Sequence, residues 1–427
     1  MQNHPADQEP RRVLGSFFAP RSQNTPTWEQ RKLDEEFDFT VPNNTLSRAE
    51  LNQESGSVRN VHYGDVLIKY GSVLDVQNDE LPFITGRSKD DFKGALLQNG
   101  DIIIADTAED ETTGKVCEIV NIQDKDVVAG LHTMVCRPKN KTAEGYFGYY
   151  MNSSSYHHQL LPLMQGIKVL SLSKTNVQKT TVKYPKDKAE QQKIADCLRR
   201  IDTLITLHQR KYEKLVNIKK SMLDKMFPPN GASVPEIRFK GFTDPWEQRK
   251  LKELYFQLTE RNTDLLPYQK TLSVATMSFK TDGNGAADTS LANYKRLRTG
   301  DIAFEGHTSK EFRYGRFVLN DVGDGIMSPR FSALRPLHEM PINFWKYYIH
   351  YEPIMRKVLV NSTKAGTMMN ELVINDFLQG SILVPSMAEQ QAIGRFFKQL
   401  DTLITLHQRK LEKLQNIKKS CLEKMFV

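Results

Sequence analysis

The ten-residue segment DTLITLHQRK occurs at residues 202–211 and again, letter for letter, at residues 401–410. The likeness continues downstream, so that residues 202–227 and 401–426 differ at only four of 26 positions. A repeat of this quality, at an offset of 199 residues, predicts a tandem duplication of one structural unit. The chain of 427 residues is long enough for two or three domains, each with its own hydrophobic core.

Shorter matches extend the duplication upstream, in the same order in both halves. They predict the order variable module, near-identical segment, variable module, near-identical segment. The matches are WEQRKL at 28–33 and 246–251, GDIII and GDIAF at 100–104 and 300–304, CRP and LRP at 136–138 and 334–336, FGYY and WKYY at 147–150 and 345–348, and AEQQ at 189–192 and 388–391.

The near-identical segments are predicted to be long helices, named here rod one and rod two. From residue 188 to 227 there is no glycine or proline, and apolar side chains recur at steps of three or four. Pro185 precedes this segment and Pro228 ends it. About 40 residues at ~1.5 Å each make a rod of roughly 60 Å. A rod with so narrow an apolar stripe requires a partner helix, and its twin at 388–426 is the expected one.

Antiparallel pairing of the rods is the favoured arrangement, because it gives a pseudo-twofold object. Parallel pairing stays open, since an extended linker at 229–245 could span the distance at up to ~3.3 Å per residue. The residues expected at the interface between the rods, or against a partner, are Ile201, Leu204, His208, Leu215, Ile218, Leu400, Leu403, His407, Leu414 and Ile417.

The variable modules are predicted to be mixed α+β modules of about 150 residues. Short apolar runs between turn residues predict strands, among them 66–70 (VLIKY), 101–106 (DIIIAD) and 301–306 (DIAFEG). Helices are expected over 149–164 and 344–359. The expected division is a lead-in at 1–26, a first module at 27–185, rod one at 186–228, a linker at 229–245, a second module at 246–385 and rod two at 386–427.

The net charge of +8 is of the sign that nucleic-acid-binding proteins carry. The excess lies in the rods, because residues 186–226 hold 11 Lys and Arg against 6 Asp and Glu, and residues 386–425 hold 8 against 4. Solvated helix faces would account for this excess equally well. Charge alone therefore does not identify a DNA-binding domain.

Several module loops combine Lys or Arg with Ser, Thr, Asn or Gln, the side chains that contact phosphates and base edges. Any one such loop is more often plain solvated surface. The matched positions of Gly166-Ile-Lys168 and Lys364-Ala-Gly366, each after the predicted helix of its module, favour a shared role. The candidate DNA-binding residues are Arg87, Lys89, Lys93, Lys168, Ser171, Lys174, Thr175, His307, Thr308, Ser309, Lys310, Arg313, Arg316 and Lys364.

The sequence contains no complete signature of a catalytic site. No GxGxxG motif occurs, and TTGKV at 112–116 lacks both the first glycine and the magnesium-binding Ser or Thr of a phosphate loop. Asp79 with Asp91 and Lys93 resembles a nuclease cluster, but the second module has no counterpart. The sequence therefore indicates a non-enzymatic protein.

Metal and membrane sites are not indicated either. His208 and His407 have no companions at metal-ligand spacing, so packing between the rods is the simpler interpretation. The four cysteines form no CxxC pair, and no run of 18 apolar residues exists. Reduced thiols in a cytoplasm are the expectation.

Two variable modules alternating with two near-identical helices, each preceded by AEQQ, resemble the specificity (S) subunit of Type I restriction–modification enzymes. WEQRKL, GDI, the proline before the helix and AEQQ-x-I carry the resemblance over essentially the full chain. It implies two target recognition domains on an antiparallel coiled coil, each reading one half of a split double-stranded DNA sequence. It also implies that two methyltransferase subunits dock on the coiled coil, and that two restriction subunits can join them.

By the same resemblance, S-adenosylmethionine, ATP and magnesium would bind to partner subunits and no cofactor to this chain. The alternative from another class is a scaffold that binds two copies of a protein ligand and no DNA. Salt dependence separates the two, because DNA affinity carried by phosphate contacts falls steeply as salt rises.

Overall fold

The computed structural model describes residues 28–229, 231–280 and 288–426, and the lead-in expected at 1–26 lies outside them. The chain forms two compact units. Unit one contains the described residues up to His208 together with those from Lys410 onward, and unit two runs from Gln209 to Arg409. Each unit contains sheets, short helices and parts of both rods, so the α+β class and the tandem duplication are confirmed.

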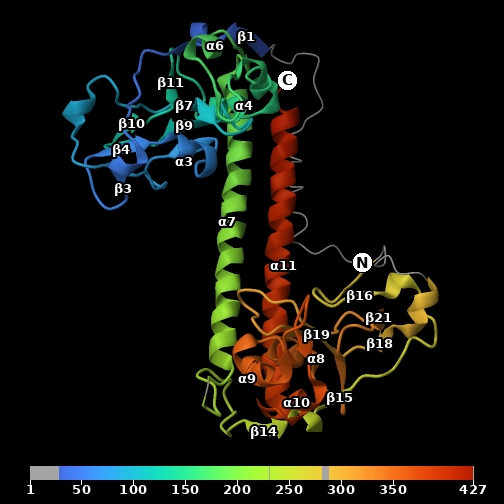
Figure 1. The fold of residues 1–427 in the computed structure, drawn as a ribbon. Helices are drawn as coiled ribbons and strands as arrows, with labels where there is room; N and C mark the ends of the chain where they lie inside the picture. Colours follow the sequence, from blue (N-terminus) through green and yellow to red (C-terminus); the bar gives the residue numbers. More distant parts are fainter. Residues whose placement is uncertain (1–27, 230, 281–287, 427) are drawn as a thin grey trace. The chain divides into compact units, whose positions relative to one another are not determined.

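Unit one is built on two sheets (Figure 1). The five-stranded sheet has the order β2 (Phe37–Asp38), β11 (Thr133–Pro138), β7 (Ile102–Ala105), β9 (Val116–Val120), β5 (Val73–Asp75), and only β5 and β9 pair in parallel. The four-stranded sheet has the order β10 (Asp126–Ala129), β4 (Val58–Val61), β6 (Phe83–Ile84), β3 (Leu51–Asn52). Two further pairs join β1 (Trp28–Lys32) to β13 (Thr181–Pro185) and β8 (Thr107–Ala108) to β12 (Leu170–Ser171).

Strand β7 follows the GDI motif and is buried on both faces. Ile102 and Ile104 pack with the aromatic residues of α4 (Tyr146–Met151). Ile103 and Ala105 point to the other face, toward α3 (Tyr63–Ile68) and β10. Alternation along a strand sends neighbouring side chains to opposite faces, which explains why this strand is a continuous apolar run rather than an alternating one.

Unit two repeats the plan with a four-stranded antiparallel sheet. Its order is β15 (Tyr255–Gln257), β22 (Ala333–Pro336), β19 (Ile302–Glu305), β20 (Arg316–Leu319). The helices that cover it are α8 (Ile342–Tyr348), α9 (Glu352–Ser362) and α10 (Ile374–Gln379). Two-stranded pairs are β14 (Glu247–Lys250) with β25 (Ser381–Val384), β16 (Leu272–Ser273) with β17 (Ser278–Phe279), β18 (Lys295–Leu297) with β21 (Gly325–Met327) and β23 (Thr363–Lys364) with β24 (Glu371–Leu372).

Two local predictions are wrong. No strand forms at 66–70; residues 66–68 are instead the end of helix α3, whose first turn is capped by the ring of His62 accepting from the Gly64 N–H. The single helices expected at 149–164 and 344–359 are each broken: α4 is followed by the short α5 (Ser154–His157), and α8 is followed by α9. In both modules the aromatic helix before the break shares a core with its sheet.

The rods are the helices α7 (Lys188–Met226) and α11 (Met387–Lys424). In unit one, Cys197 and Cys421 share a core, and Lys418 Nζ lies 2.6 Å from Asp202 Oδ1, so the helices run antiparallel. In unit two, Lys219 Nζ lies 2.7 Å from Asp401 Oδ1. Because the duplication relates Asp202 to Asp401 and Lys219 to Lys418, these are two copies of one contact.

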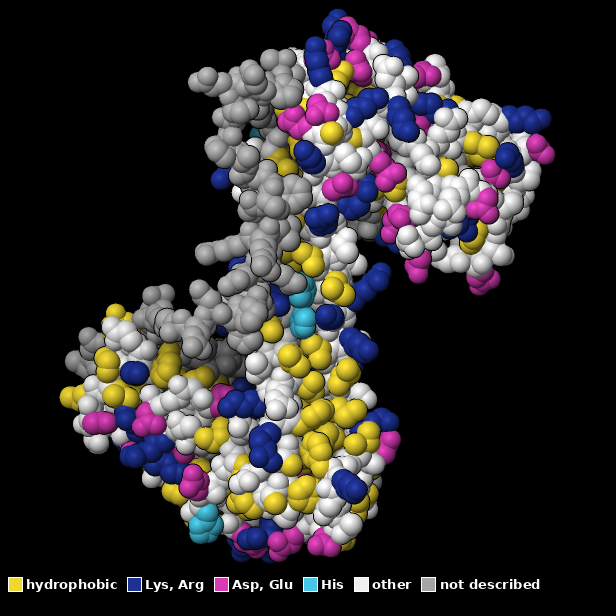
Figure 2. Space-filling model, turned by 180° about the vertical axis from the view of Figure 1, so that it is seen from behind, with side chains coloured by type: hydrophobic (Ala, Val, Ile, Leu, Met, Phe, Trp, Pro, Cys, Tyr) yellow, Lys and Arg dark blue, Asp and Glu magenta, His cyan; other side chains and the backbone are white. Residues whose placement is uncertain are grey.

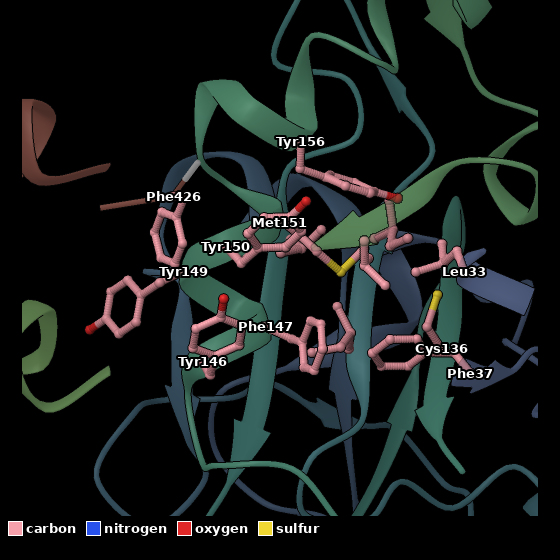
Figure 3. Close-up of a cluster of buried hydrophobic side chains, with 14 of the residues drawn as sticks. Leu33, Phe37, Cys136, Tyr146, Phe147, Tyr149, Tyr150, Met151, Tyr156 and Phe426 are labelled. Atoms are coloured by element: carbon pink, nitrogen blue, oxygen red, sulfur yellow. The ribbon is translucent and has the colours of Figure 1, made fainter. Parts of the chain in front are cut away.

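The hydrophobic core of each unit is completed by the end of one rod. In each case this is the rod that begins in the other unit. In unit one, the Phe426 ring lies 5.8 Å from Tyr146 and 5.5 Å from Tyr150, while Tyr149 points away from the sheet and donates to Asp202 Oδ2 at 2.9 Å (Figure 3). In unit two, Phe227 takes the same place, 5.3 Å from Tyr348. The KMF triplet that ends each rod is therefore part of a core.

The GDI and CRP/LRP motifs meet in a buried ion pair. In unit one, Arg137 donates from Nε and Nη2 to the two carboxylate oxygens of Asp101 at 2.8 and 2.7 Å. In unit two, Arg335 makes the same bidentate contact with Asp301 at 2.9 and 2.8 Å. Both carboxylates are buried, so each motif pair ties together two adjacent central strands, β7 with β11 in unit one and β19 with β22 in unit two.

Among the described residues, no helix is both long enough and apolar enough to cross a membrane.

Candidate nucleic-acid interface

Each module carries one hairpin at an equivalent position, directly before its last short helix. Hairpin one (residues 165–171) is closed by mutual backbone bonds, Gln165 N–H to Ser171 O at 2.9 Å and Ser171 N–H to Gln165 O at 2.8 Å. Hairpin two (residues 364–371) is closed by the pairing of β23 with β24, in which Lys364 faces Glu371. The short helices that follow are α6 (Lys174–Gln178) and α10.

A glycine bends each hairpin. Gly166 has φ +120°, and a Cβ on it would collide with the carbonyl oxygen of Val169. A Cβ on Gly366 would likewise collide with the carbonyl oxygen of Met369. Both turns thus require glycine at their first position, and both present a two-residue tip, 167–168 in hairpin one and 367–368 in hairpin two.

Both hairpins are anchored to the residues that follow the GDI strand. In unit one, the Leu172 N–H donates to Asp106 O at 2.8 Å, and β12 pairs with β8. In unit two, the Asn370 N–H donates to Gly306 O at 2.9 Å, and its side-chain amide donates to Arg313 O at 3.4 Å. A buried strand therefore holds each hairpin in position.

Four candidate residues of module one lie together. Lys168 and Ser171 are exposed on hairpin one, and Lys174 and Thr175 are exposed on the first turn of α6. The Ser173 hydroxyl caps that turn by accepting from the Asn176 N–H at 3.3 Å.

The other three candidates of module one belong to a different sheet. Arg87, Lys89 and Lys93 surround a short 3-10 turn beside the four-stranded sheet. Lys89 Nζ lies 3.2 Å from Asp126 of β10, and Arg87 lies 3.9 Å from Asp91. These side chains are exposed but are partly neutralised by their acidic neighbours.

The candidates of module two are brought together by Asn370, which links hairpin two to the loop between β19 and β20. Arg316 opens β20, and its guanidinium lies 4.9 Å from the Phe312 ring. Lys364 lies in β23. The exposed candidate residues of the loop are His307, whose Nδ1 lies 2.5 Å from Glu305 Oε1, and Thr308, Ser309, Lys310 and Arg313; the acidic Glu311 is exposed among them.

Two features of the interface were not predicted from the sequence. The tips carry exposed apolar side chains, Ile167 and Met368. A cavity of about 440 Å³ adjoins hairpin two, with Phe304, Arg330 and Phe331 in its wall. Matching glycines in the two halves indicated the turns, and the apolar residue one or two positions after each glycine was the signal that could have located the tips.

The expected rod-interface residues differ in burial. Leu403 is 43% exposed, because the buried stripe of α11 passes through Ile404 instead. The other expected residues are less exposed: Ile201, Leu400 and Leu414 are buried, and Leu204, His208, Leu215, Ile218, His407 and Ile417 are half-buried.

No group of three His, Cys, Asp or Glu able to hold a metal occurs within 28–229, 231–280 and 288–426.

The carboxylates of the nuclease-like cluster have structural roles. Asp79 accepts from the Asp75 N–H at 2.8 Å and closes a turn. Asp91 accepts from the Ser88 N–H at 2.8 Å, a bond that lowers the pKa of its carboxyl. Both side chains are therefore held by backbone groups of their own turns.

Glu118 is a buried carboxyl of unit one with a raised pKa. Burial raises the pKa of Glu118 to about 7, although it accepts from the backbone N–H of Gly145 and Gly148 at 2.6 and 2.9 Å. It ties α4 to β9 inside the core, away from the hairpin.

Comparison with known proteins identifies the family. The model of the Type I restriction modification DNA specificity domain matches twice, over residues 26–217 and 244–416. A putative type I restriction enzyme MjaX specificity subunit from Methanocaldococcus jannaschii is 21% identical over 92% of this chain and 91% of its own length. The crystal structure of a Type-I restriction-modification system S subunit from M. genitalium shares the fold, with a TM-score of 0.58 at 14% identity over 96% of this chain and 98% of that one.

The two matched segments each contain one module and most of one rod, in agreement with the duplication in the sequence. Members of this family supply DNA sequence specificity and are not themselves catalytic. The chain therefore belongs to the Type I restriction–modification specificity subunits and carries two DNA specificity domains in tandem.

Proposed function

We propose that each module reads one half of a split double-stranded DNA sequence, and that hairpin one with α6, and hairpin two with the loop 306–316, make the contacts. The observation that carries this assignment is the recurrence of a glycine-bent hairpin on the end of the same buried strand in both units. A rigid support of this kind is what base reading requires, because donors and acceptors must meet base edges in a fixed register.

Local charge supports the same assignment. Residues 165–175 contain Lys168 and Lys174 and no acidic residue, and residues 361–370 contain Lys364 and no acidic residue. Elsewhere on the face drawn in Figure 2, lysine and arginine are interspersed with aspartate and glutamate. Hairpin one with the start of α6 therefore provides a local acid-free surface suited to a phosphate backbone. In unit two, Glu371 faces Lys364 and Glu311 is exposed on the loop 306–316, so the basic residues there have acidic neighbours.

The rods are proposed to space the two readers and to dock two methyltransferase subunits, which restriction subunits then join. Hydrophobic side chains gather over the second half of α7 (Figure 2), where Ile218 and Met222 line a groove of about 510 Å³. Docking of a partner helix or loop there would cover apolar surface. S-adenosylmethionine, ATP and magnesium would bind to those partners, in a cytoplasm that also holds the DNA.

The decisive experiment is modified-base sequencing of one host genome with and without this chain, with its methyltransferase partner present throughout. Methylation at a new motif of two short half-sites around a fixed gap is the expected result. A stable complex with the partner but no new motif, together with binding that does not change with salt, would instead support a protein scaffold.

Replacing both lysines of the first interface, Lys168→Ala with Lys174→Ala, is expected to weaken methylation through one half-site only. Loss of two phosphate contacts should also lower the salt slope of DNA binding by about two. Lys139→Ala with Lys141→Ala serves as the control, because these exposed lysines lie in the same unit outside the hairpin. Equal loss at both half-sites would show that Lys168 and Lys174 support folding or partner binding instead.

A further inference from the structure

We infer that Ile167 and Met368 are specificity-determining residues, each making an apolar contact with the C5-methyl group of a thymine, one in each half-site. This inference rests on the proposed function and names which side chains carry part of the base reading. The polar candidates on the same hairpins supply phosphate and hydrogen-bond contacts, and an apolar tip adds a different kind of selectivity.

The exposure of the two side chains is the first observation. Ile167 is 100% exposed and Met368 is 74% exposed, although each belongs to a unit with a well-formed core. Both lie in the two-residue tip of a glycine turn, Ile167 one residue after Gly166 and Met368 two residues after Gly366, in hairpins that the duplication makes equivalent. A large apolar side chain held in water by a rigid turn gains free energy only when a partner covers it.

The surroundings identify that partner as nucleic acid. Ile167 has Lys168 beside it, and the exposed residues that follow on hairpin one and α6 include Ser171, Lys174 and Thr175. A protein-binding surface would have a broader apolar centre. Hairpin one instead presents Ile167 and the half-exposed Val169 in a polar loop without acidic residues, and hairpin two presents Met368 in a polar loop with one acidic residue, Glu371. That composition fits a major groove, which is flanked by phosphates and contains one apolar group.

The apolar group in the major groove is the thymine methyl, which distinguishes an A·T pair from the other pairs. Met368 is also suited to it, because it borders the cavity lined by the Phe304 and Phe331 rings. Arg330 lies in the same wall, with its guanidinium 5.7 Å from the Phe331 ring. An unbranched thioether can adjust to a methyl group entering beside these rings.

The test uses the complex of this chain with its methyltransferase and the duplex identified by genome sequencing. Each thymine is replaced in turn by uracil, which removes only the methyl group. In the wild type, one replacement in each half-site should weaken binding about fourfold, the value expected for one buried methyl. Ile167→Ala should weaken binding by roughly tenfold and abolish the uracil effect in one half-site, and Met368→Ala should do the same in the other.

Matched controls are available in both units. Ile68, 85% exposed on α3, and Leu265, 67% exposed in unit two, lie outside the hairpins. Ile68→Ala and Leu265→Ala should leave both DNA affinity and the uracil effect unchanged. Circular dichroism of all four variants should match that of the wild type, since none of these side chains belongs to a core.

The outcomes separate the two levels of the proposal. Unchanged affinity in Ile167→Ala and Met368→Ala, an undiminished uracil effect in these variants, or half-sites without any A·T pair would contradict the inference and leave the proposed function intact. Failure of Ile167→Ala to bind the methyltransferase in the absence of DNA would assign the tip to the protein partner. Absence of any sequence-specific DNA binding by the wild-type complex would overturn the proposed function itself.

Discussion

At the scale of single residues, the two halves share equivalent contacts as well as similar sequences. The Asp101–Arg137 and Asp301–Arg335 pairs occupy the same place in their sheets, and each joins two short motifs that are more than 30 residues apart. An aspartate so deeply buried depends on its arginine, because a buried charge without a partner is strongly unfavourable.

Replacing either arginine tests that dependence. Arg137→Ala and Arg335→Ala are each expected to lower the free energy of unfolding by about 3–5 kcal/mol, since each leaves a buried carboxylate unpaired. Urea denaturation of the purified chain measures the loss. Arg31→Ala, which removes an exposed pair with Glu29 at 3.8 Å, should cost less than about 1 kcal/mol; comparable losses in all three variants would contradict the role given to burial.

The Glu118 carboxyl predicts a pH dependence of stability. Its pKa is about 7 in the folded chain, against an ordinary value of 4.5. Between these values the folded state binds more protons than the unfolded state, so this group lowers stability as pH rises from 4.5 to about 7. The loss over this range is about 3 kcal/mol.

Glu118→Gln is expected to remove that part of the slope, because the amide does not ionise. Denaturation of the wild type and the variant at intervals from pH 4.5 to pH 8 gives the difference directly. The variant should show a lower stability near pH 4.5, where one backbone donor loses its acceptor, and a smaller decline toward neutrality. Parallel curves would mean that Glu118 titrates as an exposed group does.

At the scale of elements, the rods are the part most fully determined by their own sequence. Uninterrupted spacing of apolar residues and flanking prolines predicted both helices, and the symmetry of the duplication favoured the antiparallel pairing that the structure has. Residues 66–70 show the opposite case, since VLIKY resembles a strand locally but forms the end of a helix that the His62 ring caps and Val66 anchors in the core. Long-range packing determines the conformation of this segment, and no local sequence pattern indicates it.

The candidate interface was predictable to a similar degree. Matching glycines and lysines located hairpin one and hairpin two, because a turn residue is a local signal. Which sheet each loop lies beside is a long-range property. Arg87 and Lys89 therefore looked equivalent to Lys168 in the sequence, yet they lie at another sheet with acidic partners.

The repeated ion pair between the rods is expected to have a measurable coupling energy. Asp202 and Lys418 are both half-buried, and Asp202 also accepts from Tyr149. A double-mutant cycle with Asp202→Ala and Lys418→Ala should give a coupling of about 1 kcal/mol, and the cycle at Asp401 and Lys219 should match it. The exposed Arg249–Glu253 pair is the control, with about 0.3 kcal/mol expected; unequal cycles would contradict the equivalence of the two contacts.

At the scale of the whole molecule, each unit depends on a residue supplied from far along the chain. Phe426 lies among Tyr146 and Tyr150 of unit one, and the hydroxyl of Ser155 donates to its carbonyl at 2.7 Å. Phe227 completes unit two in the same way. The sequence showed that the KMF triplets repeat, but their partners are set by the path of the chain.

Phe426→Ala is expected to destabilise unit one by about 3–5 kcal/mol, the usual range for a large aromatic residue removed from a core. Hydrogen exchange read by mass spectrometry should show faster exchange in peptides from α4 and β11 and little change in those from α8 and β19. Phe227→Ala should show the reverse pattern. Equal acceleration in both units after either change would mean that the two cores unfold as one.

The discontinuous composition of unit one has a consequence for synthesis. Unit two is a single continuous stretch and has all of its residues once the ribosome has passed Arg409. Unit one begins earlier but waits for residues from Lys410 onward, so its core is completed only by the codons up to that of Phe426. The half that is translated first is therefore finished last, and a premature stop in those codons damages the amino-terminal reader while sparing the other.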